Sequence, residues 1–221
     1  MDKVDSEAAK TLIDRVSIYL PEESAETVGQ AYVYADACHA GQSRKSGDPY
    51  IVHPLETALF LADLRLDTDT IIAALLHDVV EDCGVSVEEI SQRFGPEVSK
   101  LVDGVTKLTR MDDKLHPPFE DGFNLVEDSE NLYAESLRKM LVSMAEDIRV
   151  VLIKLADRLH NMKTLGALPL DKRRRIAQET LDIYSPLAHR LGIWEIKWLL
   201  EDLAFQFINP DEYKKIASML N

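Results

Sequence analysis

The chain has 221 residues, of which 46% are hydrophobic, and its formal net charge is −14 at pH 7. This length suits one large domain, alone or with an appendage, and the composition is that of a globular protein. So negative a chain is not expected to bind nucleic acid through a broad basic face, although a small polyphosphate needs only a local cation cluster or a metal.

The cysteines and the N-terminus indicate an intracellular protein. Cys38 and Cys83 lack CxxC spacing and are expected to be reduced, partly buried thiols. The first residues lack the basic and apolar regions of a signal peptide, and no apolar run approaches the length of a membrane span. We therefore expect a soluble, cytoplasmic protein that does not contact membranes.

Helical patterns follow one another along almost the whole chain. No strand with period-2 alternation and no internal repeat occurs, so the sequence predicts an all-α fold. Pro54 suits the first position of a helix, and Ser86 with Glu89 forms a capping box. The expected helices cover residues 6–20, 24–40, from 53 on, 71–82, 86–95, 96–108, 131–144, 146–165, 171–191, 193–208 and from 210 on.

The stretch 71–82 organises the chain, because six apolar residues run directly into His77, Asp78, Glu81 and Asp82. A helix that is apolar all round is buried, so we expect these four ionisable side chains to be carried into the interior. Buried carboxylates are costly unless they are paired or coordinate a metal. On one continuous helix, each of the last two acids would lie one turn beyond one of the first pair. The alternative is an exposed helix end with ordinary charges.

Two further segments offer polar side chains of a functional type. The turn-rich loop 41–49 would place two cations and a hydroxyl on an exposed edge, which a solvated turn explains equally well. In the helix expected over 146–165, four polar residues at spacings of 3, 4 and 3 share one face, which is either the solvent face or the wall of a polar pocket. These residues are Arg44, Lys45 and Ser46 in the loop, and Lys154, Asp157, Asn161 and Thr164 in the helix.

Residues 111–130 interrupt the helical pattern with Pro117, Pro118 and Gly122. From Asp112 to Glu130 there are seven acidic residues and one lysine. We expect a flexible acidic loop that is too long for a simple connector. It is either a solvated surface loop or a functional lid.

Two imidazoles and two carboxylates, expected on three helices, form a candidate metal site of His53, His77, Asp78 and Asp157. This ligand mix suits Mn²⁺, Fe²⁺ or Mg²⁺ with open positions for water and phosphate, and does not suit a closed structural zinc site. The adjacent His-Asp pair is the specific part of the pattern, because spacing alone does not single out His53 and Asp157.

Together these motifs resemble the HD superfamily of metal-dependent phosphohydrolases. The closer resemblance is to the hydrolase domain of the RelA/SpoT homologues, the enzymes of the alarmone (p)ppGpp. The motifs follow the family order over nearly the whole chain. They are Arg44–Gly47, Tyr50–Pro54, His77–Asp82, Gly104–Leu108, Leu137–Met140, Asp147–Val150, Lys154–Met162 and Tyr184–Gly192.

The resemblance implies an enzyme, guanosine-3′,5′-bis(diphosphate) 3′-pyrophosphohydrolase, that uses Mn²⁺ to convert ppGpp or pppGpp to GDP or GTP and pyrophosphate and so ends the stringent response. It implies an all-helical HD domain over residues 1–195, which includes the acidic loop 111–130. Residues 196–221 would be helices that lead to a synthetase domain and regulatory domains in a longer protein. The expected partner is the small nucleotide, without nucleic acid.

The resemblance also assigns roles to individual residues. His53, His77, Asp78 and Asp157 are the expected metal ligands, Glu81 and Asp82 position water and handle protons, Arg44, Lys45 and Ser46 contact guanine and phosphate, and Asn161 and Thr164 line the nucleotide pocket.

The chain departs from the family pattern in its long acidic loop and in Ser136, where Asn is expected. Neither change touches a metal position. Two alternatives stay open, namely an HD nucleotidase acting on another phosphorylated nucleotide and a catalytically silent regulatory module of a longer alarmone synthetase. The complete metal set and the intact Glu81-Asp82 pair favour an active hydrolase.

Overall fold

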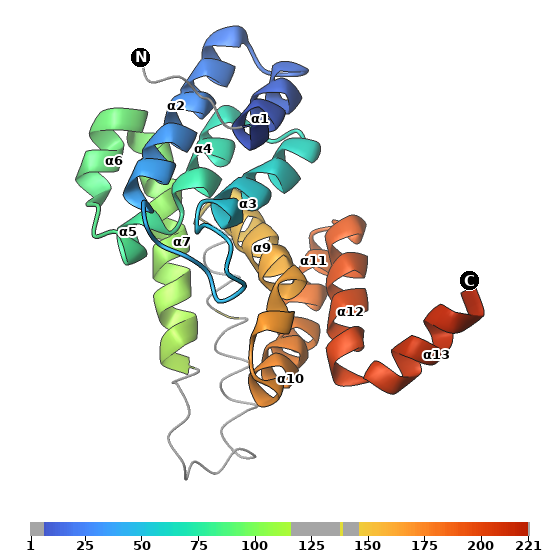
Figure 1. Ribbon diagram of the computed structural model, residues 1–221. Helices are drawn as coiled ribbons and strands as arrows, with labels where there is room; N and C mark the ends of the chain where they lie inside the picture. Colours follow the sequence, from blue (N-terminus) through green and yellow to red (C-terminus); the bar gives the residue numbers. More distant parts are fainter. Residues whose placement is uncertain (1–6, 116–137, 139–145, 221) are drawn as a thin grey trace. The chain divides into compact units, whose positions relative to one another are not determined.

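The computed structural model describes residues 7–115, 138 and 146–220 (Figure 1). Over these residues it contains helices and loops, with one isolated bridge between Ser43 and Pro49 in place of any strand. The all-α prediction is therefore confirmed. In the same part of the chain, no helix combines the length and hydropathy that a membrane crossing requires.

The chain forms two compact units, Met1–Ala156 and Asp157–Asn221, and the division falls inside one helix, α9. The first unit holds α1 (Glu7–Ser17), α2 (Glu22–Cys38), α3 (Val52–Asp63), α4 (Thr68–Leu76), α5 (Val79–Asp82), α6 (Val87–Phe94), α7 (Pro96–Leu115) and the start of α9 (Ile148–Lys163). The second unit holds the end of α9, a 3₁₀ turn η1 (Leu165–Ala167), α10 (Leu170–Glu179), a π-helical segment η2 (Thr180–Tyr184), α11 (Ser185–Arg190), α12 (Trp194–Ile208) and α13 (Pro210–Leu220).

Helix α4 forms the centre of the first unit. Every residue from Thr70 to Leu76 is buried, and α2, α3 and α7 pack against it (Figure 1). The helix begins where the sequence supplies a cap, because the Asp67 carboxylate accepts hydrogen bonds from the Thr70 N–H at 3.1 Å and the Thr70 hydroxyl at 2.7 Å. An apolar helix with a polar cap is thus fixed in the core immediately before the ionisable residues.

Several local signals act as the sequence predicts. The Ser86 hydroxyl accepts a hydrogen bond from the Glu89 N–H at 3.1 Å at the start of α6. That helix ends at Gly95, whose φ of 97° strongly favours glycine. Helix α7 then continues to Leu115, so residues 111–115 of the predicted acidic loop are helical. The rest of that loop, 116–130, and the helix expected over 131–144 lie outside the described residues, apart from Arg138.

The helix expected over 171–191 is a continuous helical run from Leu170 to Arg190, in which a π-helical segment, η2, joins α10 to α11. Pro186 lies in the first turn of α11 and has no N–H to donate. In a continuous α-helix the proline ring would crowd the carbonyl four residues earlier, at Asp182. The backbone is π-helical over Thr180–Tyr184, directly before α11 begins. Gly192, with a φ of 74°, ends α11 as expected.

Arg149, in the first turn of α9, links three parts of the first unit. Its guanidinium donates to Asp147 at 2.6 Å, to Glu97 of α7 at 3.2 Å and to Asp67, the cap of α4, at 3.4 Å. The hydrogen bonds from Arg149 hold the pKa of Asp147 below its usual range. This cluster fixes the start of the helix that carries Asp157.

Replacing Arg149 by Met should lower the free energy of unfolding by about 1.5–3 kcal/mol, because charged hydrogen bonds of this kind are lost. The stabilisation from the pair of Arg149 and Asp147 is fully present above the pKa of Asp147 in the unfolded chain, about 3.9, and is lost as the pH falls through the lower pKa of the folded state. The difference in the free energy of unfolding between the variant and the parent protein should therefore become smaller below about pH 4, which urea denaturation can measure. Arg15→Met is the matched control, because the pair of Arg15 and Asp63 is 42% and 55% exposed and should contribute at most about 1 kcal/mol. Equal losses in the two variants would contradict this role for Arg149.

Candidate metal centre

His77 lies at the end of α4 rather than inside a longer helix. The prediction of one continuous helix through residue 82 is wrong, because α4 ends at Leu76 and the separate turn α5 begins at Val79. His77 Nδ1 donates to the Ala74 carbonyl at 2.7 Å, which satisfies one of the last carbonyls of the helix. The imidazole side chain therefore takes part in ending the helix and is held in one orientation.

The Nε2 atom of His77 is buried and has no hydrogen-bond partner among the described residues. A carbonyl only accepts, so Nδ1 carries the proton and Nε2 of the neutral ring presents a lone pair. The carboxylate of Asp78 places Oδ1 at 3.2 Å from this nitrogen, without the geometry of a hydrogen bond. Two lone-pair atoms facing each other in this way fit two ligands of one cation.

His53 contributes the second imidazole from the first turn of α3. The helix begins at Val52, so Pro54 is at its third position, where the missing N–H is still one that the helix would leave unpaired. His53 is 2% exposed, and its Nε2 lies 3.5 Å from Asp78 Oδ2. Its ring centroid is 5.2 Å from that of His77.

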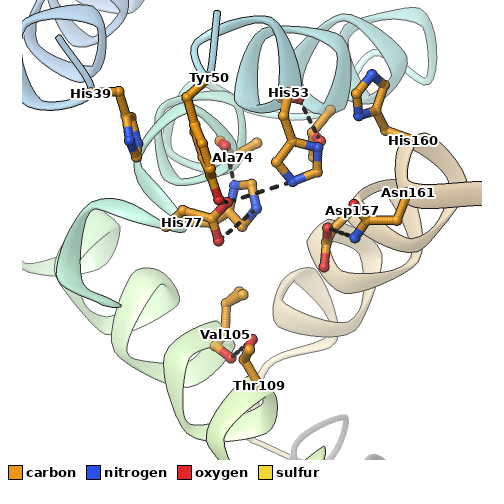
Figure 2. A network of polar contacts seen from close by, with 12 residues as sticks. His39, Tyr50, His53, Ala74, His77, Val105, Thr109, Asp157, His160 and Asn161 are labelled. Atoms are coloured by element: carbon orange, nitrogen blue, oxygen red, sulfur yellow. Dashed lines mark hydrogen bonds and ion pairs between the residues drawn. The ribbon is translucent and has the colours of Figure 1, made fainter. Parts of the chain in front are cut away.

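Asp157 directly follows Ala156 on α9 and is 5% exposed. One ligand atom each of His53, His77 and Asp157 lies within 4.8 Å of the others (Figure 2). Asn161, one turn further along α9, donates to Asp157 Oδ1 at 2.6 Å and so orients this carboxylate. Two imidazoles and a carboxylate, with the Asp78 carboxylate beside both rings, fit a divalent metal ion.

The acidic residues are less buried than the sequence predicts. Only His77 of the four ionisable residues is buried, whereas the side chains of Asp78 and Glu81 are 16% and 18% exposed and Asp82 is exposed. The reason is that the apolar core ends with α4 and Val79, and the single turn of α5 leads back to the surface. The two acids of α5 consequently lie where water and a dissolved substrate have access.

Arg110 of α7 lies beside this pair, with its Nε 3.6 Å from Glu81 Oε1. The sequence gives no local sign of this contact, because the two residues are brought together by the packing of α5 on α7. The arginine side chain is 62% exposed, so it adds a cation near the acids without burying it.

The loop 41–50 is closed by backbone hydrogen bonds. The Arg44 N–H donates to the Asp48 carbonyl at 2.9 Å, and the Tyr50 N–H donates to the Gln42 carbonyl at 3.1 Å. Lys45 and Ser46 are exposed, as expected of this loop. Arg44 is partly buried, and its guanidinium carbon lies 5.7 Å from the centroid of the Tyr50 ring.

The polar stripe of α9 is not a solvent face over its first part, because Lys154 is 8% exposed and Asp157 is buried as well. The Lys154 ammonium donates to the Thr109 hydroxyl of α7 at 3.1 Å. Thr164 follows the end of α9, and its hydroxyl donates at 3.3 Å to the His160 carbonyl of that helix. The solvent-face interpretation therefore does not apply to Lys154 and Asp157.

Tyr50, to which the sequence assigns no role beyond the motif Tyr50–Pro54, contacts the candidate ligands. Its hydroxyl donates to Asp78 Oδ2 at 3.0 Å, and its ring stacks on buried His39 (Figure 2). Burial and the nearby carboxylates raise the pKa of Tyr50, so the hydroxyl stays protonated and remains a donor. In the sequence, the one indication that Tyr50 belongs to the site is its position three residues before His53, a candidate metal ligand.

The chain belongs to the HD-domain family, because the model of that family, described as "HD domain", matches residues 31–194. It is 49% identical over 211 residues, 96% of the chain, to the bifunctional (p)ppGpp synthase/hydrolase SpoT of Escherichia coli K12. It is 48% identical over 209 residues, 95% of the chain, to the GTP pyrophosphokinase rsh of Brucella ovis. The resemblance to the hydrolase domain of the RelA/SpoT homologues is thus confirmed.

A solved structure has the same fold. It is described as a metazoan orthologue of SpoT that hydrolyses ppGpp and plays a role in starvation responses, and it matches with a TM-score of 0.59 and 28% identity. The match covers 85% of this chain and 96% of that one. By contrast, the chain spans 26% and 28% of the length of the two bacterial relatives.

Proposed function

We propose that the chain is a (p)ppGpp hydrolase domain, which removes pyrophosphate from the 3′ position of guanosine tetra- or pentaphosphate with Mn²⁺ as its metal. The observation that carries the proposal is the buried Nε2 of His77, which has no hydrogen-bond partner among the described residues and faces Asp78, beside His53 and Asp157. The hydrolase named among the relatives, at 49% identity, supports the choice of substrate.

The proposal assigns His53, His77, Asp78 and Asp157 to the metal and Glu81 and Asp82 to water and protons. A divalent cation held there would polarise a phosphoryl oxygen and lower the pKa of water. Glu81, half-buried beside Arg110, is assigned the role of orienting the attacking water and accepting its proton. Asp82 is exposed and can exchange protons with solvent. It is assigned the role of donating a proton to the 3′ oxygen of the ribose when the bond between that oxygen and phosphorus breaks.

The same proposal gives the exposed loop the task of holding the nucleotide. Arg44 is assigned to the guanine face, because a guanidinium can lie flat on a purine, and Lys45 and Ser46 to the phosphates. Asn161 and Thr164 are assigned to the ribose side of the pocket. Asn161 donates to Asp157 Oδ1, which keeps its amide beside the candidate metal cluster. That residues 196–221 lead to a synthetase domain stays a prediction.

The test is to incubate the purified chain with ppGpp and Mn²⁺ and to measure the products. GDP and pyrophosphate should form in equal amounts. A parallel assay with other phosphorylated nucleotides distinguishes the proposed function from the two alternative functions. Turnover of another nucleotide in preference to ppGpp would indicate an HD nucleotidase of different specificity. Metal binding without turnover of any nucleotide would indicate a silent regulatory module. Either result would overturn the proposal.

Arg44→Ala should weaken binding of ppGpp about tenfold and reduce discrimination against the adenosine analogue. The reason is that a desolvated cation–π contact is worth on the order of 1–2 kcal/mol. Arg44→Lys is the matched control, since it keeps the charge and loses the planar group, and it should show most of the same loss of selectivity. Competition between the two nucleotides measures the effect. An unchanged guanine preference in Arg44→Ala would place base recognition elsewhere.

A further inference from the structure

Tyr50 connects the metal cluster with a buried aromatic support. Its ring lies against His39 with centroids 4.4 Å apart and planes 15° from parallel, and it contacts the His53 ring edge-to-face at 6.2 Å. His39 is itself 3% exposed and is fixed by Gln42, whose Oε1 lies 2.9 Å from His39 Nδ1. In Figure 2 the rings of His39 and Tyr50 stand side by side, with the Tyr50 hydroxyl directed toward His77.

The hydroxyl of Tyr50 interacts with two carboxylates, those of Asp78 and Asp82. It donates to Asp78 Oδ2 at 3.0 Å, whereas Asp78 Oδ1 lies 3.2 Å from His77 Nε2. Asp78 occupies the N-cap position of the one-turn helix α5, just after the break that follows α4, and its side chain makes no capping hydrogen bond there. A donor on a rigid ring therefore supplies an orientation that α5 does not.

We propose that Tyr50 is a positioning residue, whose hydroxyl holds the Asp78 carboxylate in the orientation required to bind the metal together with His77. This inference rests on the proposed function, because Asp78 is a metal ligand only within it. Groups that hydrogen-bond to metal ligands fix the ligand orientation, and their loss commonly weakens metal affinity 10–100-fold. Tyr50 does not contact the reacting atoms in this assignment, so its effect passes through Asp78.

The variant that tests this is Tyr50→Phe, which keeps the ring stacked on His39 and beside Arg44 and removes only the hydroxyl. Its dissociation constant for Mn²⁺, measured by the electron paramagnetic resonance of free Mn²⁺, should rise about 10–100-fold. The metal-free protein should unfold at nearly the parent temperature, whereas the stabilisation by Mn²⁺ at a fixed concentration should shrink. Excess Mn²⁺ should restore most of the turnover, and guanine preference should not change.

Tyr34→Phe is the matched control. Tyr34 on α2 also donates to a carboxylate, that of Glu89 on α6 at 2.7 Å, but Glu89 is not a candidate metal ligand, so loss of this hydroxyl should leave Mn²⁺ affinity unchanged. Parent-like Mn²⁺ affinity in Tyr50→Phe would overturn the inference while the proposed function stands. A parent protein that hydrolyses ppGpp without binding Mn²⁺ would overturn the proposed metal site itself. The Mn²⁺-induced shift is measured within each variant, so the comparison holds even if Tyr50→Phe lowers the metal-free stability.

Discussion

Replacing His77 or Asp157 by alanine is expected to remove both the bound metal and all measurable hydrolysis of ppGpp. Each side chain is buried and supplies one of three ligand atoms that lie within 4.8 Å of one another. Losing one leaves an incomplete ligand set and carboxylates without a counter-charge. Chelation of the parent protein should have the same effect, and added Mn²⁺ should restore activity to the parent but not to the variants.

Metal content after desalting and turnover, measured on one preparation, provide the readout for these variants. His189→Ala is the control, because His189 is an exposed histidine whose ring contacts Trp194 of the second unit. It should retain metal and activity. A chelated parent protein with full turnover, or a His77→Ala protein that keeps its metal, would show that the cluster has been assigned wrongly.

The second large effect concerns the acids of α5. Glu81→Gln and Asp82→Asn should each retain the metal and lower turnover by about 10²–10⁴, the usual contribution of general acid–base assistance. Binding of the substrate should change much less, since the lost interaction belongs mainly to the transition state. The metal should be retained because Glu81 and Asp82 lie one turn beyond Asp78. Glu81 is half-buried and Asp82 is exposed, so neither belongs to the buried cluster of metal ligands.

Glu88→Gln separates this effect from a general loss of negative charge, because Glu88 is an exposed acid in the first turn of the next helix. It should leave turnover and metal content unchanged. If Asp82→Asn loses its metal, Asp82 is a ligand. If it turns over normally, the residue has no part in the chemistry. Either result would remove Asp82 from the proposed division of roles.

The sequence predicts best those features that depend on neighbours in the chain. The apolar run 71–76 predicts the buried helix, Ser86 with Glu89 predicts the start of α6, and Gly95 predicts its end. The adjacent pair of His77 and Asp78 also marks the candidate metal site without any structure. These features follow from capping, hydrophobic burial and metal-ligand chemistry within a few residues.

The features that the sequence misses depend on contacts between distant segments or on competing local bonds. At the break after Leu76 the His77 ring donates to the Ala74 carbonyl, a local bond that the hydrophobic pattern does not predict. Tyr50 meets Asp78 across 28 positions of sequence, and no periodicity signals that contact.

The most direct test of the central claim is to titrate the metal-free chain with Mn²⁺ while recording bound metal and ppGpp hydrolysis together. The account predicts that the two curves coincide and reach their maximum at one Mn²⁺ per chain, with GDP and pyrophosphate as products. Full turnover before any Mn²⁺ is bound, or saturation of the site without hydrolysis, would contradict it.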